Sequence, residues 1–147
     1  MAVNVSVETT IASDRQTVAA FVIDPHNDLR WIGALTSVRI IDESPMQVGT
    51  KVERIAKFLG KRIEYVNEIT ELRPGVRLAM RSVKAPFEMQ VSYDFADAPG
   101  GTRVTVRAGG DASGYYKLAG PLLPLMVRAG IKRDLKQLKK VMESSAP

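Results

Sequence analysis

Polar side chains that can do chemistry cluster in two neighbouring segments, 50–59 and 62–72. If the even positions of the first and the odd positions of the second face inward, Arg54 lies opposite Asn67, with Tyr65 beside them. Ser82, from the segment that follows, then pairs with Asn67 on its other side. These side chains are candidates for polarising or hydrogen-bonding a carbonyl or carboxylate, because a guanidinium binds both in bidentate fashion.

A buried arginine needs a partner, because an uncompensated interior charge costs several kcal/mol. Glu71 shares the expected inward face of the 62–72 segment and is the predicted partner of Arg54. Two interpretations therefore stand side by side. Arg54 forms a structural bond with Glu71 or Asn67, or it anchors a ligand carboxylate or carbonyl.

No catalytic residue is predicted. His26 is the only histidine, and its place after Pro25 at a helix start favours a solvated loop residue over a general base. Asp24 and Asp28 are interpreted as acids of a helix start. The sequence contains no glycine-rich phosphate loop, no pair of carboxylates that we can place on one face, and no nucleophile elbow.

Composition narrows the possible function classes. The 147 residues are 45% hydrophobic and 25% charged, which is typical of one globular domain spanning 1–147. The absence of cysteine excludes disulfides, thiol nucleophiles and cysteine-ligated metals, and a single histidine excludes a multi-histidine site. We therefore expect no metal and no cofactor. No apolar run of about 20 residues and no signal-peptide pattern is visible, so we expect a cytoplasmic protein.

The net charge of +5 comes entirely from the last 36 residues, because residues 1–111 hold equal numbers of basic and acidic side chains. A basic segment of this kind is most often the solvated face of a terminal helix. The alternative is weak contact with an anionic membrane. Nucleic-acid binding is not expected, because no aromatic residues are interleaved with the basic residues of the expected C-terminal helix for base stacking.

Hydrophobic periodicity predicts an α+β chain. Residues 3–11 alternate as a half-buried strand, and Ser13 opens a capping box with Gln16 at the start of a short helix. Asp24-Pro25 can cap a second short helix. Period two then predicts six antiparallel strands at 38–42, 50–59, 62–72, 76–82, 87–95 and 102–108. A Gly60-Lys61 hairpin turn is expected.

Cross-strand pairing supports a single sheet with one buried face. Pairing about the expected turns brings apolar residues together as Phe58–Ile63, Ile69–Met80, Met80–Met89 and Tyr93–Val106.

A long helix is expected to follow, with Pro121 and Pro124 in its first turn and an end near Met142. One apolar stripe comprises Val127, Ile131, Leu135, Leu138 and Met142. Leu122, Leu125, Met126 and Ala129 lie nearly opposite this stripe. That second apolar side is covered by loops, or it faces a cavity, a membrane or a subunit partner.

The order of elements resembles the helix-grip fold of the START-like SRPBCC superfamily, in which a seven-stranded curved antiparallel sheet wraps around a long C-terminal helix. The local sequence is most similar to the polyketide cyclase/dehydrase and lipid transport family. Five short stretches carry this resemblance: Ile11-Ala12-Ser13, Trp31-Ile32, Val48-Gly49-Thr50-Lys51-Val52, Glu68-Ile69-Thr70-Glu71-Leu72-Arg73-Pro74-Gly75 and Gly101-Thr102-Arg103-Val104-Thr105-Val106.

The resemblance implies a cavity between sheet and helix that holds an apolar ligand, and we expect a volume of a few hundred Å³, as is usual for ligand sites. The expected pocket residues are Trp31, Leu35, Arg54, Phe58, Tyr65, Asn67, Met80, Ser82, Met89, Val91, Tyr93, Leu122 and Met126. The leading hypothesis is a carrier or binder of a small apolar or amphipathic molecule such as a lipid, fatty acid or aromatic polyketide-like compound. A polyketide aromatase/cyclase or dehydratase is the alternative, and a module docking on an anionic membrane or protein is the second alternative. Monomer and homodimer both stay open.

Overall fold

The computed structural model describes residues 2–41, 45–58, 60–85, 88–111 and 122–144. In chain order its elements are β1 (Ala2–Ile11), α1 (Arg15–Ile23), the 3₁₀ helix η1 (Pro25–Arg30), β2 (Leu35–Ile40), β3 (Lys51–Phe58), β4 (Lys61–Arg73), β5 (Arg77–Lys84), β6 (Glu88–Ala98), β7 (Gly101–Asp111) and α2 (Leu123–Ser144). The strands form one antiparallel sheet in the order β1-β7-β6-β5-β4-β3-β2. The predicted α+β helix-grip architecture is confirmed.

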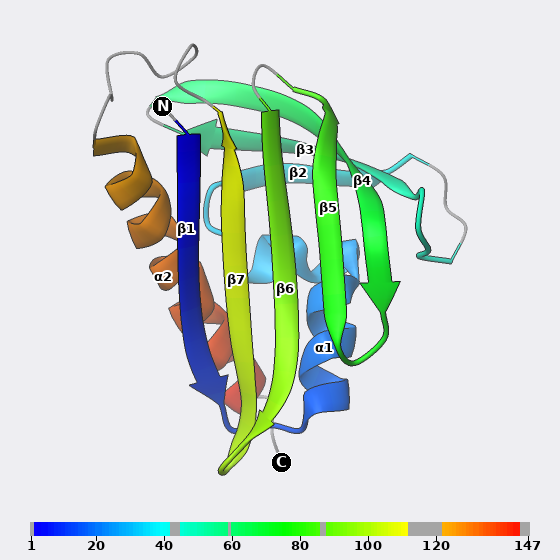
Figure 1. Ribbon diagram of the computed structural model, residues 1–147, viewed down its shortest axis with the longest axis vertical. Helices are drawn as coiled ribbons and strands as arrows, with labels where there is room; N and C mark the ends of the chain where they lie inside the picture. Colours follow the sequence, from blue (N-terminus) through cyan, green and yellow to red (C-terminus); the bar gives the residue numbers. More distant parts are fainter. Residues whose placement is uncertain (1, 42–44, 59, 86–87, 112–121, 145–147) are drawn as a thin grey trace.

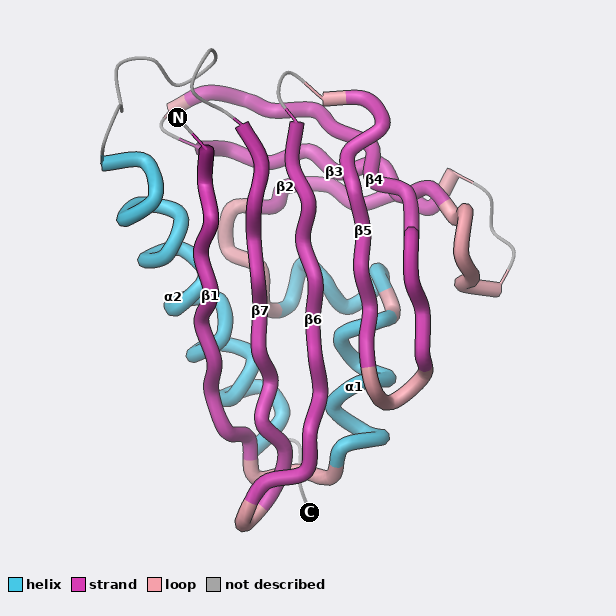
Figure 2. Tube along the Cα trace, viewed as in Figure 1, coloured by secondary structure: helices cyan, strands magenta, loops and turns pink. Residues whose placement is uncertain are grey.

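Figure 1 shows how the layers are arranged. The sheet curls, so that β2 and β3 cross over the upper part of the view while β1, β7 and β6 run lengthwise. The helices α1, η1 and α2 all lie on one side of the sheet, which Figure 2 shows in a single colour for each type of element. Within the described ranges, no helix has the length and apolarity needed to cross a membrane.

The starts of the two short helices follow their capping residues. Asp14, rather than the predicted Ser13, caps α1, because its backbone is extended and its carboxylate accepts the backbone N–H of Thr17 at 3.0 Å. The expected cap of η1 is confirmed. The side chain of Asp24 accepts the backbone N–H of His26 at 3.0 Å, and Pro25 occupies the first helical position.

The long helix α2 packs its predicted apolar stripe on the sheet. Leu135, Leu138 and Met142 are buried, whereas Val127 and Ile131 are partly buried against the core. Cationic side chains of α2 also bond to edge strand β1: Arg128 donates to the carbonyl of Ser6 at 3.1 Å, and Lys139 to that of Thr10 at 2.7 Å. These bonds occupy backbone acceptors that an edge strand would otherwise leave open.

The sequence predicts correctly which face of the sheet each of these side chains occupies, but it does not always predict the residue that pairs with it on the neighbouring strand. Ile69–Met80, Tyr93–Val106 and Asn67–Ser82 pair as predicted. Three predicted pairs are wrong by two residues, because Phe58 pairs with Lys61, Met80 with Val91 and Arg54 with Tyr65. A shift of two residues keeps every side chain on its predicted face, since side chains alternate with period two.

The first of these shifts comes from the hairpin between β3 and β4. Phe58 pairs directly with Lys61, and Gly60 lies in the turn with φ 75°. The turn therefore precedes Lys61 instead of including it. Glycine is favoured at Gly60 because this φ lies in the left-handed region.

A β-bulge in β4 overturns the predicted role of Glu71. Pairing changes from Ile69–Met80 to Glu71–Ala79, so Thr70 is an extra residue and Glu71 turns to the face away from the helices. There the Glu71 carboxylate accepts from Arg77 Nε at 2.9 Å and forms an ion pair with Arg73. Glu71 is therefore not the partner of Arg54.

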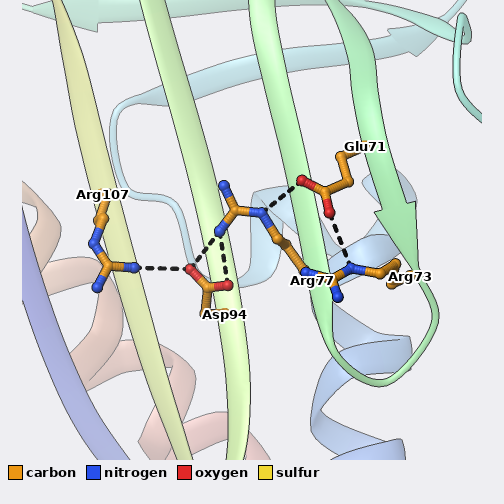
Figure 3. Close-up of polar contacts among 5 residues, drawn as sticks. All are labelled: Glu71, Arg73, Arg77, Asp94 and Arg107. Atoms are coloured by element: carbon orange, nitrogen blue, oxygen red, sulfur yellow. Dashed lines mark hydrogen bonds and ion pairs between the residues drawn. The ribbon is translucent and has the colours of Figure 1, made fainter.

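On the outer face of the sheet, an ion-pair network joins side chains of the four strands β4, β5, β6 and β7 (Figure 3). Arg77 Nη1 donates to both carboxylate oxygens of Asp94 at 2.7 Å, and Arg107 donates to the same carboxylate at 2.9 Å. The hydrogen bonds that Arg77 donates to Asp94 and Glu71 raise the pKa of Arg77. Glu71 and Asp94 are thus paired with arginines on the outer face of the sheet.

Candidate functional site: a cavity between the sheet and α2

Two adjoining cavities lie between the sheet and the first half of α2, where the sequence predicts a ligand space. The outer cavity has a volume of about 220 Å³ and the inner cavity about 180 Å³. Both are lined by Tyr65 and Met89 from the sheet and by Val127, Ile131 and Asp134 from α2. Most of the remaining wall is apolar, so the two cavities can accept an apolar molecule.

Most of the expected pocket residues line these cavities. The inner cavity is lined by Trp31, Arg54, Tyr65, Asn67, Met80, Met89, Val91 and Tyr93. The outer cavity is lined by Phe58, Tyr65, Met89 and Met126. Their common origin is the inward period-two face of β3 to β6, together with the end of η1 and the first turns of α2.

Three expected pocket residues lie elsewhere. Leu35 is buried but lines neither cavity, because it packs where β2 pairs with Ala56 of β3. The Ser82 hydroxyl accepts the backbone N–H of Met89 at 3.0 Å and is used within the sheet. Leu122 is 59% exposed, and its neighbour Leu123, which is 2% exposed, lines the outer cavity in its place.

Arg54 points into the inner cavity as predicted, but its charge is already matched. Asp28 of η1 accepts from Arg54 Nε at 2.9 Å and lies 2.8 Å from Nη2. Both residues are buried. Burial opposes the charge of Arg54, but its electrostatic interactions, of which that with the Asp28 carboxylate is the largest, together outweigh burial and raise the pKa of the guanidinium. Burial raises the pKa of Asp28, and Arg54 partly offsets that rise.

Asp28 lies in the first turn of η1, as interpreted from the sequence, but its buried carboxylate also pairs with Arg54. The cation on the cavity wall is therefore compensated and not free. A ligand carboxylate placed beside Arg54 would also meet Asp28, so this part of the wall favours a neutral group.

Two buried polar atoms, on residues that line the inner cavity, have no hydrogen-bond partner among the described residues. They are the indole Nε1 of Trp31, a donor, and Oδ1 of Asn67, an acceptor. The Trp31 and Tyr93 rings pack edge to face, with their centroids 6.0 Å apart. Leaving one such buried group unsatisfied costs about 1–3 kcal/mol, so both atoms favour a polar occupant of the inner cavity.

The two tyrosines of the inner cavity supply neutral hydroxyl groups. Burial raises the pKa of Tyr65 and also that of Tyr93. Both phenols stay protonated at neutral pH and can donate a hydrogen bond to an oxygen atom in the cavity.

Asp134 is a lining residue that the sequence analysis missed. Its carboxylate accepts the backbone N–H of Gly33 at 3.1 Å, and burial raises its pKa. This bond ties α2 to the segment between η1 and β2, beside the cavities. Its position gave a signal, since Asp134 follows Ile131 by three residues and precedes Leu138 by four, on the apolar stripe itself.

Solved structures share this fold over nearly their whole length. A START superfamily protein from Mycobacterium smegmatis is 12% identical, with a TM-score of 0.83 and coverage of 97% of this chain and 99% of that one. An aromatase/cyclase from a Streptomyces species is 17% identical, with a TM-score of 0.81 and coverage of 97% and 94%. A protein from Thermus thermophilus is 18% identical, with a TM-score of 0.82 and coverage of 97% and 99%.

No curated protein matches this sequence. The sequence model of one family, described as polyketide cyclase / dehydrase and lipid transport, matches residues 2–143. The match covers the described strands β1 to β7, the helices α1 and η1, α2 as far as Glu143, and the residues that line both cavities. On this match, the chain belongs to the polyketide cyclase/dehydrase and lipid transport family.

Proposed function

We propose that this protein binds a small apolar or amphipathic molecule in the outer and inner cavities. The observation that carries the proposal is the pair of adjoining, mainly apolar cavities between the sheet and α2. Protein interiors are normally packed with few voids larger than a water molecule. Two cavities of about 220 and 180 Å³ are larger than the voids of an ordinary packed interior, so they indicate a ligand-binding site.

Native mass spectrometry of the purified protein tests this proposal directly. We expect a co-purifying small molecule that leaves under denaturing conditions. Protein that carries none should still bind dodecanoate, a flexible twelve-carbon acid, with one-to-one stoichiometry. A chain that carries no ligand and binds no apolar probe would contradict the proposal.

The charged end of an amphipathic ligand is best placed away from Arg54, in an open groove beside α2. This side groove has a volume of about 550 Å³ and shares Phe58, Met126 and Gly130 with the outer cavity. Its charged residues are Lys57 and Arg133, both cations, and neither side chain has an ion-pair partner among the described residues. An anionic group in the side groove can meet both cations while the apolar part enters the outer cavity.

The double variant Lys57→Gln/Arg133→Gln is expected to bind dodecanoate about tenfold more weakly at low salt, since each exposed pair contributes up to about 1 kcal/mol. Binding of methyl dodecanoate, which has no charge, should be unchanged. Calorimetry or fluorescence competition measures both affinities.

Lys51→Gln/Lys136→Gln is the matched control, because it removes two exposed cations from the same elements, β3 and α2, outside the cavities and the groove. This control should bind both probes as the wild type does. The placement of the charged end would be contradicted if Lys57→Gln/Arg133→Gln bound dodecanoate and its methyl ester equally more weakly. It would also be contradicted if both double variants lost the same affinity for dodecanoate.

A polyketide cyclase or dehydratase is the second candidate function. Arg54, Tyr65 and Asn67 bring hydrogen-bond donors to the inner cavity. Such donors can polarise the carbonyl of a folded substrate and accelerate a reaction by positioning it. The similar fold of an aromatase/cyclase supports this candidate. Liquid chromatography with mass analysis separates the two functions. A carrier returns its co-purified ligand unchanged, a dehydratase lowers the substrate mass by one water, and a cyclase that loses no water gives a product of equal mass and different retention time.

Contact with an anionic membrane is a further candidate, supported by the exposed face of α2. Leu122 is 59% and Leu125 62% exposed. At helical spacings of three and four, Leu125 is followed on this face by Ala129, Lys132, Lys136 and Lys140, all exposed. An interfacial helix needs this combination of apolar side chains and cations.

Liposome co-sedimentation checks this membrane contact. Each cation near an anionic surface contributes about 1 kcal/mol, so Lys132→Gln/Lys136→Gln/Lys140→Gln should lose more than about tenfold in binding to anionic vesicles at low salt. Lys139 stays, because it bonds to Thr10 and Glu143. Lys51→Gln/Arg81→Gln/Lys84→Gln, exposed on the sheet, is the control. Equal binding to neutral and anionic vesicles, or none to either, would exclude the contact.

A further inference from the structure

We infer that the inner cavity recognises a neutral hydroxyl group of the ligand through Trp31 Nε1 and Asn67 Oδ1. This inference rests on the proposed ligand-binding function and adds the chemistry of the ligand's inner end. The ligand class is an apolar molecule with an alcohol or phenol at the end that enters first. Its remaining apolar part lies in the outer cavity.

The primary observation is the pair of unpartnered atoms. Trp31 is 4% and Asn67 3% exposed, both line the inner cavity, and neither Nε1 nor Oδ1 has a hydrogen-bond partner in the described part of the chain. Buried polar atoms in native proteins nearly always have partners. The two atoms come from separate elements, the end of η1 and the middle of β4, so one local distortion does not account for both.

The types of the two atoms select the ligand group. Trp31 Nε1 can only donate, and Asn67 Oδ1 can only accept. A hydroxyl group both accepts and donates, so it is the smallest neutral group that can satisfy both atoms. An ether or a ketone can accept from Trp31 but cannot donate to Asn67.

The surroundings exclude a charged group at this point. The charge of Arg54 is compensated by Asp28 at 2.8 Å, so a carboxylate would lie beside a carboxylate. Within the described ranges, the hydrogen-bond acceptor of Arg54 Nη1 is the sulfur of Met80, at 3.8 Å, and sulfur is a weak acceptor. A ligand oxygen would therefore find a further donor in Arg54 without bringing a charge into the cavity.

A rigid set of probes tests the inference by calorimetry. β-Naphthol offers a hydroxyl, β-methoxynaphthalene offers only an acceptor, and naphthalene offers neither. The wild type should bind β-naphthol about tenfold more tightly than naphthalene, with the ether between them, because a net hydrogen bond is worth about a tenfold change.

Two variants separate the contributions of the two atoms. Trp31→Phe removes the donor, and Asn67→Leu removes the acceptor. In each variant the preference for β-naphthol over naphthalene should fall to about threefold or less, while the affinity for naphthalene stays within about twofold. The control is Ser82→Ala, at the register partner of Asn67 but outside both cavities, and it should keep the tenfold preference.

The single tryptophan gives a second readout. Its indole N–H produces one cross-peak in a nitrogen–proton NMR spectrum. That peak should lie downfield in the β-naphthol complex relative to the naphthalene complex, because the N–H donates to the hydroxyl only in the former.

The outcomes distinguish this inference from the proposed function. If β-naphthol and naphthalene bind with equal affinity, water satisfies the two atoms, the inference is wrong and the ligand-binding function stands. If neither these probes nor dodecanoate binds the wild type, the proposed function is wrong and the inference fails with it. A preference for β-naphthol that survives both Trp31→Phe and Asn67→Leu would also overturn the inference.

Discussion

Replacing Asp28 with alanine is expected to lower the free energy of unfolding by about 3–5 kcal/mol, because it leaves Arg54 as an uncompensated buried charge. Asp28 and Arg54 are 2% and 5% exposed, and the carboxylate holds the guanidinium through Nε and Nη2. The pair also joins η1 to the middle of β3. Urea denaturation followed by circular dichroism measures the loss.

Two further variants show whether the loss comes from the unpaired charge. Asp28→Leu/Arg54→Met removes both charges and should recover most of the stability, since well-packed apolar residues often replace a buried ion pair without loss. Glu64→Ala breaks the exposed pair with Arg62, whose side chains are 67% and 65% exposed, and should cost no more than about 1 kcal/mol. A loss for Asp28→Ala as small as that for Glu64→Ala would show that cavity water solvates Arg54.

The face of the sheet on which each side chain lies can be predicted, because it depends on the local alternation of apolar and polar residues. The inward positions of β3 and β4, including Arg54, Tyr65 and Asn67, follow from period two within one segment. Partners depend in addition on where each turn begins. A turn displaced by one residue moves the pairing by two, and the face pattern is the same for both registers. This is why Arg54 was assigned the right side of the sheet and the wrong neighbour.

The partner of Arg54 was beyond sequence reasoning for a different reason. Asp28 in η1 has the local pattern of an ordinary acid near a helix start, and only the packing of η1 against β3 buries it. Glu71 was the natural choice by alternation, but the bulge at Thr70 reverses the face of every later residue in β4. The inserted residue shifts the apolar alternation by one position, from Ile69 to Leu72, but a single shift this close to the end of a strand does not by itself specify a bulge.

This exchange of partners changes what the cavity can bind. Because Asp28, and not Glu71, pairs with Arg54, Arg54 contributes hydrogen-bond donors to the cavity without adding a net charge. Cations without an ion-pair partner in the described part of the chain occur instead at Lys57 and Arg133 in the side groove. The chemistry of the site therefore favours a ligand with its neutral oxygen inside and its anionic group outside, opposite to the orientation expected if Arg54 were a free anchor.

Substituting Gly130 with leucine is expected to stabilise the protein and to weaken dodecanoate binding by more than about tenfold. The weakening follows because the ligand loses a buried apolar contact area about as large as one side chain. Gly130 lies within α2 and lines both the outer cavity and the side groove. A Cβ atom at Gly130 meets nothing within 4 Å. The leucine side chain can therefore occupy the path by which a ligand enters, while a glycine in a helix interior costs about 0.5–1 kcal/mol relative to better helix formers.

Gly130→Ala and Gln137→Leu separate the two effects of that leucine. Alanine should give a similar gain in the free energy of unfolding, about 1 kcal/mol, with dodecanoate affinity within about threefold of the wild type, because one methyl group fills little of the cavity. Gln137 is exposed on α2 outside both cavities and the side groove, so Gln137→Leu should leave binding unchanged. If Gly130→Leu stabilises the helix yet binds dodecanoate as the wild type does, the ligand does not pass between α2 and β3. A glycine at this point of α2 then has no role in access, and the proposed position of the cavity entrance is wrong.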